Sequence, residues 1–171
     1  MQLVVAAIGR AKNSAFAPLI EDYSKRVNRS GPSIGVKSLT IVEAEAPHRL
    51  SGAKRRLAEA ELLRRNAGLD DTLGSKKTTE KAFLITLDER GKSFSSIAFA
   101  HLLQHHVDGG TQRLAFLIGG ADGLDSSLRN QSNITLTLGQ MTWPHLMVRA
   151  MLIEQIYRAT MILSGHPYHR E

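Results

Sequence analysis

The chain has 171 residues, a length that fits a single domain, and 42% of them are apolar, which is enough to build a hydrophobic core. Charged residues make up 22%, close to the globular average of about 25%. This composition excludes a disordered tail, a collagen and a coiled coil. The sequence contains no cysteine, which excludes disulfides, thiolate nucleophiles and cysteine-ligated zinc and fits a reducing compartment such as the cytoplasm.

The positive charge is concentrated in one part of the chain. The net charge is +6, and residues 1–66 hold 12 Lys and Arg against 6 Asp and Glu, whereas residues 67–171 hold 10 against 10. A basic surface on one part of a domain indicates a polyanionic partner, most often nucleic acid. The alternative is a soluble protein that is basic in general.

Apolar runs alternate with helical patterns along the whole chain. In the first half we expect a strand over 2–8, a helix from Asn13 or Ser14 to Val27, a loop over 28–35, a strand over 36–42, a helix over 51–66 and an exposed loop over 70–80. In the second half we expect a strand over 82–87, a helix from Ser95 or Ser96 to Val107, a strand over 114–118, a short helix over 125–131, a strand over 134–138 and a helix over 144–163. This alternation predicts an α/β fold, a mainly parallel sheet with helices on both faces, in one domain over 1–171.

The last expected helix is apolar on more than one side. It carries one polar stripe of Glu154, Gln155 and Arg158 and a second of Arg149 and Thr160, with apolar side chains between them. These polar residues also exclude a membrane span, which needs about 20 mostly apolar residues. One apolar face covers the sheet, and the other predicts a second subunit, so we expect a homodimer. The alternative is a helix buried inside a monomer.

Three turn segments follow the third, fourth and fifth expected strands, at 87–92, 118–123 and 138–145. Because open α/β sheets bind ligands at the carboxyl ends of their strands, we expect the three segments to form one ligand site. The third opens a helix, whose free amide groups can bind a polar ligand, and Met141 and Trp143 can wall an apolar pocket. Taken alone, the glycine turn reads as a tight turn and Trp143 as a core residue.

Seven histidines invite a metal site, but the pattern does not support one. His101 and His105 are four residues apart on a helix, yet no HExxH pattern completes a zinc site, and a solvated helix face is the favoured interpretation. In the tail, Tyr168 and His169 can stack on an unpaired base and Arg170 can contact phosphate. The alternative for the tail is a frayed terminus.

Several ordered motifs give the chain a family resemblance. LDERGKSFSS, LIGGADGL, LTLGQMTWPHLMVR, LIEQIYRA and the terminal GHPYHRE resemble, in order, the blocks of the RlmH family, the SPOUT-class methyltransferases of 23S rRNA pseudouridine. The resemblance implies a C-terminal trefoil knot, a homodimer and S-adenosylmethionine as cofactor, with no metal. The cofactor contacts that it implies are Leu87, Gly120, Gly139, Gln140, Met141, Thr142, Trp143 and Pro144. One departure is Gly139, where the family often has Ser.

The resemblance also implies the reaction, which is methylation of N3 of pseudouridine 1915, preferably on the 70S ribosome, by a cytoplasmic enzyme that binds neither DNA nor membrane. His145 and His169 are the candidates for assisting loss of the N3 proton. The residues expected to contact RNA are Arg149, Arg158, Tyr168, His169 and Arg170 by resemblance, and Arg55, Arg56, Arg64 and Arg65 from the basic helix. The alternatives are another SPOUT enzyme that modifies tRNA or a ribose, and a ribosome-binding protein without catalysis.

Overall fold

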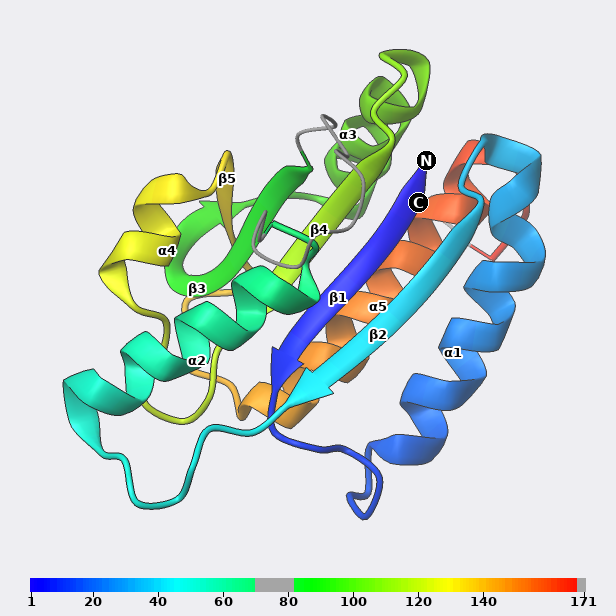
Figure 1. Ribbon diagram of the computed structural model, residues 1–171. Coiled ribbons are helices and arrows are strands. Elements are labelled where there is room, and N and C mark those ends of the chain that lie inside the picture. The colour runs from blue at the N-terminus through cyan, green and yellow to red at the C-terminus, as the bar shows by residue number, and fades with distance from the viewer. Residues whose placement is uncertain (70–81, 169–171) are drawn as a thin grey trace.

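The computed structural model describes residues 1–69 and 82–168, which form one five-stranded parallel sheet (Figure 1). The strand order is β2-β1-β4-β3-β5. The strands are β1 (Gln2–Ile8), β2 (Ser38–Ala44), β3 (Phe83–Ser93), β4 (Arg113–Ile118) and β5 (Ile134–Thr137). The predicted parallel α/β fold is therefore confirmed. The expected loop over 70–80 and the tail residues His169 and Arg170 lie outside the described residues.

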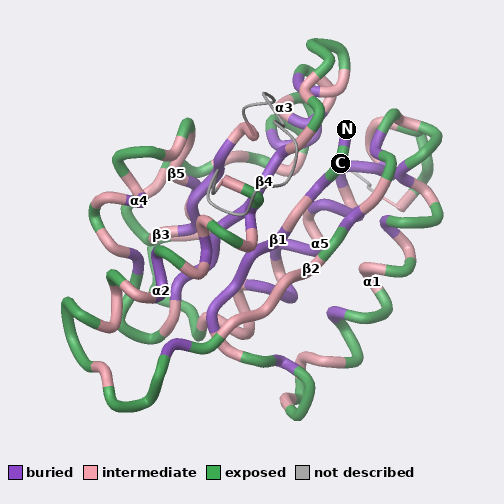
Figure 2. Tube along the Cα trace, in the orientation of Figure 1, coloured by how far each residue is buried: buried purple, intermediate pink, exposed green. Residues whose placement is uncertain are grey.

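Helices cover both faces of the sheet, as predicted. One face carries α1 (Ala17–Ser30), α3 (Ser96–Asp108) and α5 (His145–Leu163), and the other carries α2 (Gly52–Asn66) and α4 (Ser126–Gln131) (Figure 1). Because side chains alternate across a sheet, successive residues of a strand pack in two separate cores, one on each face. In β4, for example, Phe116 packs in the core on the α5 side, whereas Ala115 and Leu117 pack on the α2 side. Figure 2 shows the central strands buried along most of their length.

The first helix and the loop after it differ from the prediction. Helix α1 begins at Ala17, because the Ser14 hydroxyl donates to the carbonyl of Ala11 in a preceding turn and does not cap the helix. It continues past Val27 to Ser30, and the expected loop contains a 3₁₀ turn, Gly31–Ile34. Strand β2 consequently starts two residues later than predicted.

Strand β3 is longer than predicted and contains a bulge. Leu87 and Lys92 both pair with Leu136 of β5, so residues 88–91 project from the ladder between them. A Cβ atom on Gly91 would lie 2.5 Å from the backbone carbon of Leu136, so the bulge can approach β5 this closely only with glycine. The expected loop after the third strand is therefore a bulge within the strand.

Helix α5 is buried on nearly all sides. Leu152, Ile153, Ile156 and Ala159 are inaccessible to solvent, as expected for a helix between other helices and a sheet. The predicted second polar stripe is wrong, since Arg149 and Thr160 are also fully buried. Their polar groups find partners inside the protein, so helical periodicity misjudged their exposure.

Candidate functional site

The largest cavity described, about 940 Å³, lies at the carboxyl ends of β3, β4 and β5. Its wall includes residues from the β3 bulge, from the glycine turn after β4 and from the loop before α5. The predicted convergence of the three segments is therefore confirmed. Of the cofactor contacts implied by resemblance, the wall contains Leu87, Gly120, Met141, Thr142, Trp143 and Pro144. Gly139 lines a different cavity, and Gln140 is exposed and lies outside both walls.

The glycine turn after β4 is held tightly against the sheet. The amide of Gly123 donates to the carbonyl of Gly120 at 3.1 Å, and Gly123 has φ +77°, a conformation that favours glycine. A Cβ atom on Gly120 would lie 2.9 Å from each carboxylate oxygen of Glu59, so a side chain at this position would require the carboxylate to shift. After the turn, Asp125 caps α4 by accepting from the amide of Ser127 at 2.9 Å. The two hydrogen bonds from Ser127 lower the pKa of Asp125.

Apolar side chains of the loop before α5 are open to the cavity. Met141 is 71% exposed and Trp143 is 37% exposed, so the interpretation of Trp143 as a core residue is wrong. The hydroxyl of Thr142 donates to the carboxylate of Glu89 at 2.6 Å, which joins this loop to the β3 bulge across the cavity mouth. Pro144 precedes α5 without a side-chain cap, which leaves the first amide groups of the helix for a ligand. The loop can therefore bind a molecule with an apolar body and polar ends.

His145 is half-buried in the wall of the cavity, at the first turn of α5. Burial lowers the pKa of its imidazole, and the positive charge of Arg149 lowers it further, whereas Glu59 acts in the opposite direction. A lowered pKa keeps the ring neutral at pH 7, the form that can accept a proton. Of the two predicted proton acceptors, His145 lines the cavity, and His169 lies outside the described residues.

Arg149 does not contact solvent, so its predicted role in binding RNA is wrong. Its side chain is 0% exposed and forms an ion pair with Glu43 of β2. It also donates to the carbonyls of Ile8 and Gly9, at 3.1 and 3.0 Å. Arg149 therefore ties α5 to the ends of β1 and β2 beneath the cavity.

Arg158 and Tyr168 lie in a polar cluster away from this cavity. Arg158 pairs with Glu154 at 2.5 Å, and the Tyr168 hydroxyl donates to the same carboxylate at 3.3 Å. Tyr168 also stacks edge-on against Tyr157, with ring centroids 4.9 Å apart. Burial is the main cause that raises the pKa of Tyr168. The cluster anchors the chain up to Tyr168, and the residues after it lie outside the described structure.

The predicted basic surface of α2 is divided by the structure. Arg55 pairs with the buried carboxylate of Glu59 at 3.0 Å, and Arg56 lines the large cavity. Arg64 is partly buried and Arg65 is exposed. The ion pair with Glu59 gives Arg55 a structural role, and contact of Arg56, Arg64 and Arg65 with a polyanion stays a prediction.

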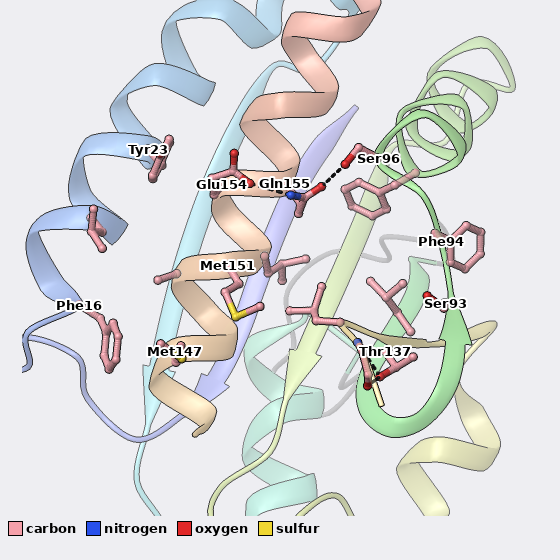
Figure 3. Close-up of a pocket in the computed structure, with 17 residues that line it drawn as sticks. Phe16, Tyr23, Ser93, Phe94, Ser96, Thr137, Met147, Met151, Glu154 and Gln155 are labelled. Atoms are coloured by element: carbon pink, nitrogen blue, oxygen red, sulfur yellow. Dashed lines mark hydrogen bonds between the residues drawn. The ribbon is translucent and has the colours of Figure 1, made fainter. Parts of the chain in front are cut away.

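A second cavity of about 570 Å³ lies between α1, α5 and the segment joining β3 to α3 (Figure 3). Its wall includes Phe16, which precedes α1, and Met147 and Met151 of α5. Leu19 of α1 also lines it and is 49% exposed. We call this cavity the apolar groove. Met147 and Met151 belong to the apolar arcs of α5 for which the sequence predicts a second subunit, and both are half-buried here.

Two further observations concern a metal-binding cluster and a membrane-spanning helix. Within residues 1–69 and 82–168, no three His, Asp or Glu side chains gather in a way that could hold a metal ion. His101 and His105 are exposed on α3. The neighbouring His106 is buried, and its Nδ1 lies 3.0 Å from the hydroxyl of Thr111. Over the same ranges, no helix has the length and apolar character needed to cross a membrane.

Comparison with known proteins shows the family of the chain. The family model described as predicted SPOUT methyltransferase matches residues 1–169. The chain therefore belongs to the SPOUT methyltransferase family.

Individual relatives extend the similarity over the full length. The chain is 43% identical to a protein of Ruegeria sp. and 44% identical to one of Rhizobium johnstonii, each over 99% of both chains, and both relatives are named Ribosomal RNA large subunit methyltransferase H. Among solved structures, it is similar to the tRNA (m1G37) methyltransferase of Aquifex aeolicus, with a TM-score of 0.52 and 12% identity over 99% of this chain and 74% of the other. This last likeness concerns the fold.

Proposed function

We propose that the protein is an S-adenosylmethionine-dependent methyltransferase that modifies N3 of a pseudouridine in large-subunit rRNA. The observation that carries the proposal is full-length similarity, at 43–44% identity, to relatives named for large-subunit rRNA methylation. The large cavity supports it, because its wall contains most of the residues that the resemblance assigns to the cofactor. Pseudouridine 1915 and the 70S ribosome, in the cytoplasm, are the substrate and setting that the resemblance implies.

The cavity has the chemistry to hold such a cofactor. Leu87, Met141 and Trp143 offer apolar surface to an adenine ring, and the glycine turn and the start of α5 offer backbone amide groups. A bound S-adenosylmethionine supplies an activated methyl group on its sulfonium. The protein's own part is to position the RNA base for in-line transfer and to exclude water.

The residue that we assign to the proton of N3 is His145, with His169 as the second candidate. His145 lines the cavity, and burial and Arg149 favour its neutral form, so its free nitrogen can accept the proton. Single-turnover methylation by His145→Gln and His169→Gln tests both assignments. Wild-type rates in both variants would remove histidine from the mechanism.

We further propose that the protein works as a homodimer with a C-terminal trefoil knot. The apolar groove supports the dimer, because the exposed Leu19 of α1 lies in its wall beside the half-buried Met147 and Met151 of α5. Leu19→Glu should lower the sedimentation coefficient from that of a dimer to that of a monomer. Leu57→Glu is the matched control, since Leu57 is 52% exposed on α2 and outside the groove. A monomeric wild-type chain would refute the dimer.

Arg56, Arg64 and Arg65 are the residues of α2 that we assign to RNA phosphates. Their replacement by Ala should weaken ribosome binding and reduce its dependence on salt, because fewer counterions are released. An unchanged salt slope would contradict this assignment.

The proposed function is tested by transfer of labelled methyl to ribosomes that lack the modification, with 70S particles compared to free 50S subunits. We expect the label in N3-methylpseudouridine, mainly from 70S. Label in tRNA or on a ribose would instead support another SPOUT specificity. Cofactor binding without any transfer would support a ribosome-binding protein that lacks catalysis.

A further inference from the structure

A carboxylate is buried behind the large cavity. The side chain of Glu59 in α2 is 2% exposed, and its Oε1 accepts from the Nε of Arg55 at 3.0 Å. Its Oε2 is buried and has no hydrogen-bond partner within the part of the chain that the structure describes. Burial of a carboxylate is unfavourable unless both of its oxygens are paired. The ion pair with Arg55 therefore does not by itself explain why Glu59 is buried.

The carboxylate lies beside Gly120 of the glycine turn. Both of its oxygens lie 2.9 Å from where a Cβ atom of Gly120 would be, and the Cγ2 of Ile8 lies 3.1 Å from the same point. Gly120 itself lines the cavity. Gly120 therefore has the carboxylate beside it and also borders the space that we assign to the cofactor.

The position of the carboxylate is fixed from the other side. Arg55 holds Oε1 from the preceding turn of α2, and the neighbouring Ala60 and Leu63 are packed in the core on that side of the sheet. Displacement of the carboxylate by the turn would therefore strain its hydrogen bond with Arg55. An apolar side chain at position 59 would lack the hydrogen bond to Arg55 that holds the carboxylate beside the turn.

We propose that Glu59 is a positioning residue of the cofactor site, whose buried carboxylate sets the place of the Gly120 turn and so the shape of the cavity wall. This role rests on the proposed function, since it assumes that the cavity binds S-adenosylmethionine. A surface-type ion pair between Arg55 and Glu59, four residues apart on one helix, would stabilise α2 without affecting the cavity. The two roles make different predictions for the pair Glu59 and Gly120.

A double-mutant cycle on this pair tests the proposal. S-adenosylmethionine binding is measured by calorimetry for the wild type, Gly120→Ala, Glu59→Asp and the combined variant, in the full-length chain. Gly120→Ala should weaken binding about tenfold, because its methyl group collides with the carboxylate and displaces the turn. Glu59→Asp keeps the charge and withdraws the carboxylate by about one methylene, so it should weaken binding about threefold on its own.

The decisive comparison is Gly120→Ala in the Glu59→Asp background, where the methyl group has room. There it should weaken binding by no more than about twofold. An equal loss in both backgrounds would overturn the proposal, and so would wild-type affinity in Glu59→Asp. Glu61→Asp is the matched control, since Glu61 is exposed on the same helix, and it should bind like the wild type.

Failure of the proposed function gives a separate result. In that case the wild-type chain does not bind S-adenosylmethionine at all, which removes the positioning role together with the cofactor. Urea unfolding of the same four proteins still tests the contact between Glu59 and position 120. If the two residues are in contact, the losses in free energy of unfolding of the two single variants should not add up to the loss of the combined variant. Binding by the wild type with additive losses refutes the positioning role alone.

Discussion

Replacement of Arg149 by Met tests whether this residue stabilises the fold from inside the protein and does not contact RNA. Met has a similar length but no donor, so Arg149→Met leaves Glu43 and the carbonyls of Ile8 and Gly9 without their partner. Loss of one member of a buried ion pair costs about 3–5 kcal/mol. Glu43 is 26% exposed and also accepts from the amide of Ala11 at 3.1 Å, so we expect about 3–4 kcal/mol.

This loss should be visible in urea unfolding followed by circular dichroism at fixed protein concentration. For a chain of this size it corresponds to a fall in Tm of about 6–16 °C. The combined variant Arg149→Met with Glu43→Gln should lose less than Arg149→Met alone, because the buried charge is removed as well.

The control is a solvent-exposed ion pair of the same kind. Lys25 and Glu21 pair at 2.6 Å with side chains 73% and 67% exposed, so Lys25→Met should unfold like the wild type. If Arg149→Met unfolds like Lys25→Met, the structural role assigned to Arg149 is refuted. If it binds RNA more weakly while its stability is unchanged, the original RNA assignment is restored.

Three further predictions concern the large cavity. Trp143→Ala should weaken S-adenosylmethionine binding about tenfold with little change in Tm, whereas Trp143→Phe should retain most of the affinity; a large fall in Tm would show that Trp143 is a core residue after all. Thr142→Val removes the hydrogen bond to Glu89 and should weaken binding about twofold, as should Glu89→Gln, and wild-type affinity in both would show that this bond does not shape the site. His145 should titrate in NMR below its ordinary pKa of 6.5. Because its pKa is lowered in the folded state, the stability that it contributes is complete above the unfolded pKa and is lost as pH falls through the folded pKa, so His145→Asn should reduce this acid-side loss; titration above 6.5 would contradict the sign.

Most of the fold was predictable because its strands are short apolar runs between helices. The cavity was predictable for a related reason, since parallel strands bring the segments after them to one edge. The extension of β3 was not, because DERGKS reads as a polar turn and only its pairing with β5 makes it a strand. The end of α1 was misplaced because Ser30, Gly31 and Pro32 resemble a loop but continue the chain into a 3₁₀ turn.

The buried charges could not be found from the sequence. Helical periodicity treats an arginine as a solvent-facing residue, and the partner of Arg149 is 106 residues away in the chain. Glu59 and Arg55 are four residues apart and read as an ordinary surface pair. Their burial depends on the packing of α2 against the sheet, which one chain's local pattern does not specify.

Helix α5 packs in the core and lines both cavities, which limits the substitutions that it can accept. Its core residues pack on the sheet, Met147 and Met151 line the apolar groove, and His145 and Val148 line the large cavity. Few of its 19 residues are therefore free to change without cost to stability or to one of the two cavities. In a saturation-mutagenesis library scored for activity, α5 should tolerate the fewest substitutions, and the exposed face of α1 around Glu21 and Lys25 should tolerate many.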